Sequence, residues 1–187
     1  MKYKNQSLTK YLNDLAARLP APGGGSAAAL NAALAAGLVS MVVNFTLGKP
    51  KYAAFTKELK AILTKSERLR KYFLDLVDLD VLAYQSKDAA KMLAVPLRLA
   101  KLCCQAQQLC PSLVKKGNIN LISDVAVAAV LLESAFVCAC FNVEINLKSL
   151  ADSKRTGKII KELKQMQKIV LKIRKDTEDN VGKVIRR

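Results

Sequence analysis

The chain has 187 residues, 51% of them hydrophobic, with eight glycines and five prolines, so it is neither disordered, collagen-like nor low-complexity. Its 31 lysines and arginines exceed its 15 aspartates and glutamates, which gives a net charge of +16 and favours a polyanionic partner or ligand, or simply a well-solvated surface. The absence of histidine excludes imidazole zinc sites and every Ser–His or Cys–His nucleophile pair.

The first 26 residues predict a short helix and a glycine-rich loop. Residues 1–19 carry charges throughout and have no apolar signal segment, so we expect a cytoplasmic protein. Ser7 is a suitable N-cap for a helix whose leucines share one side, and Pro20 ends it. The loop that follows contains Pro22-Gly23-Gly24-Gly25-Ser26 and leads directly into a second helix.

This glycine loop has two interpretations. Three glycines allow the backbone to approach a ligand closely, and the free N–H groups at the start of the next helix favour an anion or a carbonyl oxygen. The loop lacks the Lys-Ser/Thr of a Walker A motif, and no strand precedes it. An ordinary turn between two helices, with Ser26 as the cap, explains the same residues equally well.

The next segment, residues 27–47, is rich in alanine and has no charged residue. Asn44 lies on a face of small residues over which another backbone can pack closely. Together with residues 125–143, whose one charge is Glu133, this segment is long enough to span a membrane. Its alanines and asparagines favour a buried helix in a soluble bundle instead, and we expect no membrane association.

The following helix carries a regular hydrophobic stripe from Phe55 to Ala83, with spacings of four and three residues. Asp80 stands where this stripe requires an apolar residue. Since a carboxylate on a buried seam costs several kcal/mol unless it is paired or hydrogen-bonded, Asp80 is a candidate functional residue. Alternatively, the stripe shifts to Leu79 and Leu82 and leaves Asp80 at a wet edge.

The second half of the chain predicts further helices. One runs from about Ala89 to Leu109, and Pro111 and Gly117 bracket a turn. A long apolar helix extends to about Leu147, and a basic amphipathic helix begins at about Gly157. Because no alternating β pattern occurs, we expect residues 1–187 to form one all-α domain, a bundle of five to seven helices. Long apolar helices on a short chain also suggest a partner subunit.

Polar residues flank and interrupt the long apolar helix. Asn120 and Asp124 share a face if the helix has already begun, but Asn118 or Asn120 as N-cap and Asp124 near the helix dipole account for them too. Asn142 and Asn146 are one turn apart, and buried amides need partners. They either bind a polar heterocycle or bridge helices or subunits.

The five cysteines all lie in apolar runs, without a CxxC pair or a disulfide-framework spacing. We interpret them as small buried hydrophobic residues in a reducing compartment. No set of metal ligands is visible, and we expect no metal.

Together, these motifs resemble the cyclodeaminase/cyclohydrolase family, which includes the C-terminal domain of formiminotransferase-cyclodeaminase and stand-alone methenyltetrahydrofolate cyclohydrolases. The resemblance covers about residues 7–152. It rests on Pro-Gly-Gly-Gly-Ser at 22–26, Met-Val-Val-Asn-Phe-Thr at 41–46, Asp-Val-Leu-Ala-Tyr at 80–84, Val-Pro-Leu at 95–97, Gly-Asn…Ser-Asp-Val within 117–125 and Asn-Val-Glu-Ile-Asn at 142–146.

The resemblance implies an all-helical homodimer with a folate site near the subunit interface. The reaction is then either cyclisation of formiminotetrahydrofolate with loss of ammonia or hydrolysis of the methenyl bridge. A buried carboxylate suits both, because it stabilises the cationic amidine and accepts a proton. Asp80 is the first candidate for this role and Asp124 the second. The residues expected to bind the substrate are Pro22, Gly23, Gly24, Gly25, Ser26, Asn44, Asn118, Asn120, Asn142 and Asn146.

The surplus of lysine and arginine suits attraction of a polyglutamylated folate rather than of a nucleic acid, for which the chain has no reading motif and few aromatic residues. In one respect the chain departs from the family. Family members have a longer, charged stretch between the Asp-x-x-Ala-aromatic and Val-Pro-Leu elements, where this chain has only residues 85–94. The alternative is therefore a catalytically degenerate member that binds folate or acts as an interaction protein.

Overall fold

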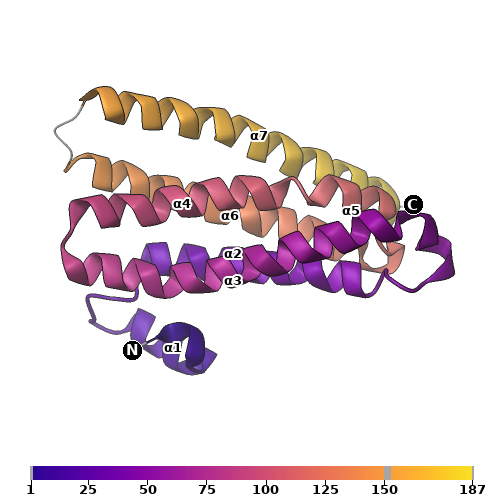
Figure 1. Ribbon diagram of the computed structural model, residues 1–187, viewed down its shortest axis with the longest axis horizontal. Coiled ribbons are helices and arrows are strands. Elements are labelled where there is room, and N and C mark those ends of the chain that lie inside the picture. The colour runs from indigo at the N-terminus through magenta and orange to yellow at the C-terminus, as the bar shows by residue number, and fades with distance from the viewer. Residues whose placement is uncertain (1, 150–152, 187) are drawn as a thin grey trace.

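The computed structural model describes residues 2–149 and 153–186, and in those residues every regular element is a helix (Figure 1). This confirms the predicted all-α fold. Four long helices, α2, α3, α4 and α6, form the body of the bundle, and α7 lies along one side while α1 lies on the other. The elements are η1 (Tyr3–Asn5), α1 (Leu8–Ala16), α2 (Gly24–Asn44), η2 (Pro50–Phe55), α3 (Thr56–Ser86), α4 (Ala89–Gln107), α5 (Cys110–Lys116), η3 (Ile119–Leu121), α6 (Ile122–Leu147) and α7 (Ser153–Ile185).

Local sequence signals explain several of the helix boundaries. The Ser7 side chain accepts a hydrogen bond from the Lys10 backbone N–H at 3.1 Å and so caps α1, as predicted. Asp88 caps α4 by accepting from the N–H groups of Ala90 and Lys91. The one residue between α3 and this cap is Lys87, whose φ of 53° reverses the chain in a tight turn.

The core is centred on α2, which packs between α3 and α6. Its small side chains let α3 approach closely, and the hydroxyls of Ser40 and Ser66 meet at 2.8 Å in the interior. The predicted stripe of α3 is confirmed, because most of its members are buried while Leu79 and Leu82 are exposed. The buried members are Leu59, Ile62, Ser66, Leu69, Phe73, Leu76 and Ala83, and Phe55 and Asp80 are partly buried.

Three predicted boundaries were wrong. Ser26 was expected to cap the second helix, but Gly23 is the N-cap and α2 begins at Gly24, so Ser26 lies inside the first turn. The sequence predicted only a turn between Pro111 and Gly117, but residues Cys110–Lys116 form α5. The N–H groups in the first turn of a helix have no partner within the helix, so a proline there costs no hydrogen bond. Pro111 therefore lies in the first turn of α5 and does not prevent the helix. The last helix begins at Ser153, about one turn before the predicted Gly157.

Two segments, α2 and residues 119–147, are long and apolar enough to cross a membrane. In α2, 61% of the most apolar stretch is buried inside the bundle, as in the core helix of a soluble protein. In residues 119–147 the buried share is 39%, so α6 keeps an apolar face on the surface. The large side chains exposed there are Val127, Val130, Phe141 and Ile145, with Leu34 of the neighbouring α2.

Candidate functional site

A cavity of about 330 Å³ lies at the end of the bundle where α2 and α4 begin and α3 and α6 end. Its size is within the range of small-molecule sites, and its walls combine apolar surface with a few polar groups. The lining residues are Pro20, Ala21, Gly23, Gly24, Gly25, Asp80, Ala83, Tyr84, Met92, Asn142, Ile145 and Asn146.

Asp80 and the glycine loop meet in this cavity. A Cβ atom at Gly25 would lie 2.7 Å from Cγ and 2.9 Å from Oδ2 of Asp80, and closer still to Oδ1. Those distances are too short for any side chain, so the carboxylate rests directly against the Gly25 backbone. The φ of Gly25 lies outside the left-handed region, so its backbone conformation does not require glycine. Glycine is required here because the Asp80 carboxylate occupies the space of a side chain.

The start of α2 provides the electrostatic environment of Asp80. The backbone N–H of Ser26 donates a hydrogen bond to the carboxylate, and the first N–H groups of a helix favour negative charge. Burial acts in the opposite direction and dominates, so the pKa of Asp80 is raised above its ordinary 3.8. A carboxylate in such a position is a stronger base than an exposed one and stabilises a cation more effectively.

Two amides on α6 form the opposite wall. The Asn142 side-chain amide donates to the Cys138 carbonyl at 2.8 Å, and that of Asn146 donates to the Met92 carbonyl at 2.7 Å. Both residues line the cavity, and each of these bonds uses one N–H, so the amide oxygen and the second N–H remain to bind a ligand. Asn146 also bridges α6 to the first turn of α4, which was the alternative role considered for it.

The structure brings together only part of the predicted site. Gly23, Gly24, Gly25, Asp80, Asn142 and Asn146 line the cavity, Pro22 is buried in the same loop, and Ser26 contacts Asp80. Asn44, Asn118, Asn120 and Asp124 lie at the other end of the bundle. The length of α2 alone separates Gly24 from Asn44 by about 30 Å.

At that far end, Asn118 joins the α5–α6 connection to the end of α2. Its backbone N–H donates to Thr46 Oγ1 at 2.9 Å, and its side-chain amide donates to the Phe45 carbonyl at 3.3 Å. Its side-chain oxygen also accepts from the Asn120 backbone N–H, as an N-cap does. Asp124 lies in the first turn of α6, where it complements the helix dipole. Within one chain, these residues occupy the structural positions that the sequence allowed as the alternative.

Several cavity residues were not singled out from the sequence. Tyr84 follows Asp80 by one helical turn, and Ile145 lies between the two amides on α6, so helical spacing was the available signal. Met92 carried no signal, because only the packing of α4 against α6 brings it to the cavity. In the described residues no three potential metal-ligand side chains cluster, and Asp80 is the one carboxylate among the lining residues.

Comparisons with known proteins place the chain among folate-related proteins. It is 34% identical over 182 residues to methenyltetrahydrofolate cyclohydrolase of Methylorubrum extorquens, covering 85% of this chain and 88% of that protein. It is 30% identical to formimidoyltransferase-cyclodeaminase of Rattus norvegicus over 88% of this chain, which spans only 36% of the rat protein. The crystal structure of formiminotetrahydrofolate cyclodeaminase from Thermotoga maritima matches with a TM-score of 0.93 and 26% identity, covering 97% of this chain and 98% of that one.

The comparisons also locate the departure seen in the sequence. The family model described as formiminotransferase-cyclodeaminase matches in two pieces, residues 7–92 and 85–165, which overlap at the α3–α4 turn. In the Methylorubrum alignment, 85% of 187 residues is about 159, so about 23 of the 182 aligned positions have no residue in this chain. With both pieces matched and the fold shared along its length, the chain belongs to the formiminotransferase-cyclodeaminase family.

Proposed function

We propose that this chain is a tetrahydrofolate one-carbon enzyme, a methenyltetrahydrofolate cyclohydrolase or a formiminotetrahydrofolate cyclodeaminase, whose reaction takes place in the Asp80 cavity. The observation that carries the proposal is the partly buried carboxylate held against the glycine-loop end of α2 and facing two amides. The names of the relatives supply the substrate class.

Both reactions occur at one carbon that is bonded to two nitrogens and carries positive charge. In the hydrolysis, water adds to this carbon and gives one proton to Asp80, which passes it to N5 as the bond between the carbon and N5 breaks. The remaining hydroxyl proton leaves to solvent, and the carbon becomes a formyl group on N10. In the cyclisation, N10 of the folate adds to the formimino carbon and gives its proton to Asp80, which passes it to the amino nitrogen as this nitrogen departs as ammonia. Asp80 suits both, because its charge stabilises the cation and its raised pKa makes it a better proton acceptor.

The remaining lining residues fit recognition of a pterin. Its ring edge has amide-like donors and acceptors, which Asn142 and Asn146 match with their free amide groups. Tyr84 and Ile145 offer apolar surface for the flat ring. The N–H groups at the start of α2 suit a carbonyl oxygen of the substrate.

The test is to mix purified protein with methenyltetrahydrofolate and follow the loss of its absorbance against a blank without protein. Acceleration that disappears in Asp80→Asn is expected for the cyclohydrolase. Ammonia release from formiminotetrahydrofolate distinguishes the cyclodeaminase. If folded protein accelerates neither reaction, the proposal is wrong and the catalytically degenerate alternative, which the shortened α3–α4 turn favours, takes its place.

We also propose that the active unit is a homodimer formed through the exposed apolar face of α6 and α2. Two copies with a charge of +16 repel each other over most of their surface, but residues 112–150 carry three positive and three negative charges. Ile145, which is 58% exposed, belongs both to this face and to the cavity, so a second copy would cover the cavity mouth. Such a site would lie near the subunit interface.

Light scattering after size-exclusion chromatography tests the dimer. Phe141→Lys, at a side chain that is 64% exposed on α6, is expected to give monomers. Leu171→Lys is the matched control, because Leu171 is an exposed apolar residue of α7, and it is expected to leave the dimer intact. Monomeric wild-type protein would contradict this part of the proposal.

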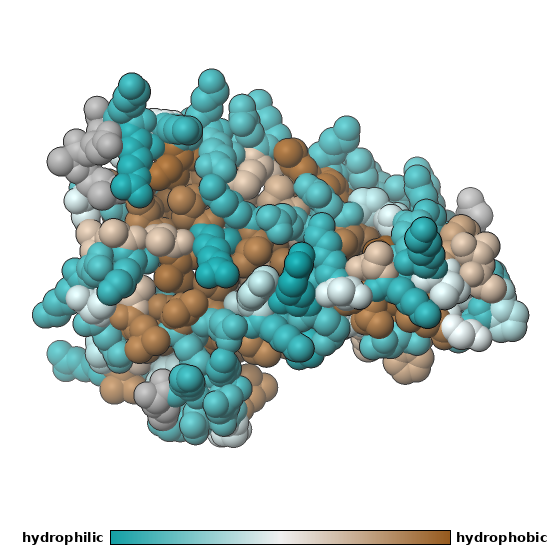
Figure 2. All heavy atoms as spheres, viewed as in Figure 1, coloured by the Kyte–Doolittle hydropathy of each residue, from teal (hydrophilic) through white to brown (hydrophobic). Residues whose placement is uncertain are grey.

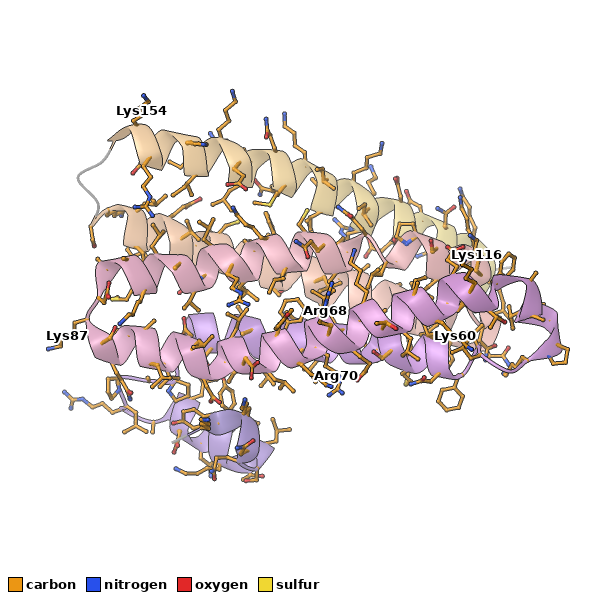
Figure 3. All side chains as sticks on the ribbon, viewed as in Figure 1. Lys60, Arg68, Arg70, Lys87, Lys116 and Lys154 are labelled. Atoms are coloured by element: carbon orange, nitrogen blue, oxygen red, sulfur yellow. The ribbon has the colours of Figure 1, made fainter. Side chains whose placement is uncertain are left out.

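We further propose that the protein is cytoplasmic and that its positive charge attracts the polyglutamate tail of a folate. Lys87 and Lys154 lie at the cavity end of the bundle (Figure 3). Hydrophilic side chains continue along the outer edge of α7 (Figure 2). A lower KM for polyglutamylated than for monoglutamyl substrate, with a difference that shrinks at high salt, is the expected result.

A further inference from the structure

Tyr11 on α1 contacts the first turn of α2 from outside the cavity. Its ring is 4% exposed, and its hydroxyl donates a hydrogen bond to Ser26 Oγ at 3.2 Å. Ser26 is fully buried, and its backbone N–H is the donor that contacts Asp80. One side chain therefore connects the first helix to the residue that holds the Asp80 carboxylate.

Tyr11 is itself held by the N-terminal segment. The Tyr3 ring meets the Tyr11 ring edge to face, with centroids 5.4 Å apart and an interplanar angle of 86°. The Tyr3 hydroxyl donates to Asp14 Oδ2 at 2.9 Å, and its backbone N–H donates to Asp78 Oδ1 at 2.6 Å. Asp78 precedes Asp80 by two residues on α3. The contacts therefore run from Asp78 on α3 through Tyr3 and Tyr11 to α2, and from there back to Asp80 on α3.

We propose that Tyr11 is a positioning residue for Asp80, because its hydroxyl fixes Ser26 and thereby the N–H donor at the start of α2 against the carboxylate. This inference rests on the proposed function, in which Asp80 is the catalytic group. A buried aromatic residue that merely filled the core would need no hydroxyl, whereas this hydroxyl is bonded to Ser26, whose backbone N–H contacts the Asp80 carboxylate.

The electrostatics agree with this geometry. Burial, together with the charge of Asp80, raises the pKa of Tyr11, so the phenol stays protonated and remains a donor at neutral pH. The other titratable group that lines the cavity with Asp80 is Tyr84 from α3, while the lining residues from α2, α4 and α6 are not ionisable. The Ser26 N–H lowers the Asp80 pKa, so loosening it makes the carboxylate harder to ionise.

The experiment compares Tyr11→Phe with Tyr3→Phe. Each variant removes one phenolic hydroxyl from the N-terminal segment and keeps the ring, but only Tyr11 bonds to Ser26. In Tyr11→Phe we expect kcat to fall roughly 5-fold with little change in KM, the factor for one hydrogen bond of ordinary net strength. In the same variant the pKa of Asp80, measured from its carboxyl carbon by NMR titration of the protein without substrate, should rise. Tyr3→Phe should leave kcat and this pKa unchanged.

A second variant, Ser26→Ala, removes the acceptor instead of the donor and is expected to raise the Asp80 pKa in the same way. If the pKa and kcat of Tyr11→Phe both match the wild type, the positioning role is wrong. Absence of folate turnover in the wild type would overturn the proposed function alone, since the NMR titration still determines whether Tyr11 controls Asp80.

Discussion

At the scale of single residues, Asp80 combines a cost in stability with a role in chemistry. Because its pKa in the folded protein is raised above 3.8, its contribution to stability is greatest below that value and is lost as the pH rises through the folded pKa. Asp80→Asn keeps an acceptor for the Ser26 N–H but removes the buried charge. We expect this variant to unfold at a higher denaturant concentration than the wild type at neutral pH, with a difference that vanishes in acid, and to lose at least about 100-fold in turnover. A destabilised variant at neutral pH would contradict this account.

Gly25 provides a second prediction at this scale. A methyl group there has no space unless Asp80 moves, because the nearby atoms belong to its carboxyl group. Gly25→Ala should therefore remove activity by displacing Asp80. Gly157→Ala is the control, because Gly157 lies on α7 outside the cavity and its Cβ would meet nothing within 4 Å, and it should be tolerated. Measuring kcat/KM and far-ultraviolet circular dichroism for both variants separates loss of the site from loss of the fold. Equal activity in the two variants would show that the Asp80 position does not depend on Gly25.

At the scale of elements, the two ends of the bundle have different roles. Asn118 makes two hydrogen bonds that join the α5–α6 connection to the residues after α2 and a third within that connection, and it is 4% exposed. Asn118→Ala keeps the backbone N–H bond to Thr46 but leaves the Phe45 carbonyl and the Asn120 N–H unpaired. Urea titration should show a loss of about 1–3 kcal/mol in the free energy of unfolding. Since Asn118 lies about 30 Å from the cavity in its own chain, kcat of this variant should hardly change. A large loss of kcat without loss of stability would contradict this expectation and would place Asn118 in the active site of the dimer.

At the scale of the whole molecule, the net charge of +16 should govern the response to salt. The ion pairs of the described residues are mostly at least partly exposed to solvent, as between Lys4 and Asp75, and such pairs contribute little to stability. Repulsion among the unbalanced positive charges acts over the whole surface and is screened by ions. Scanning calorimetry should therefore show Tm rising with sodium chloride concentration. A falling Tm would mean that ion pairs such as Arg174 with Glu133 outweigh the repulsion.

The sequence by itself determined the helical class, the family and half of the residues that line the cavity. Helical periodicity and caps act over a few neighbouring residues, so α1 with its Ser7 cap and the course of α2 and α3 were readable directly, whereas the start of α2 at Gly24 was not. Asp80 was recognisable because a carboxylate interrupted an otherwise apolar stripe, and the glycine loop because its composition is unusual.

Only the tertiary structure decided which of these motifs meet. The sequence offered Asp80 and Asp124 together, but helix length and the direction of α2 and α6 place them at opposite ends of one chain. It offered two positions for Asp80, and packing of α3 against the glycine loop selected the one in which the carboxylate touches Gly25. Tyr11 and Met92 gave no signal, because their contacts with Ser26 and Asn146 join residues 15 and 54 positions apart. Contacts at such separations depend on how the helices pack, which no local pattern encodes.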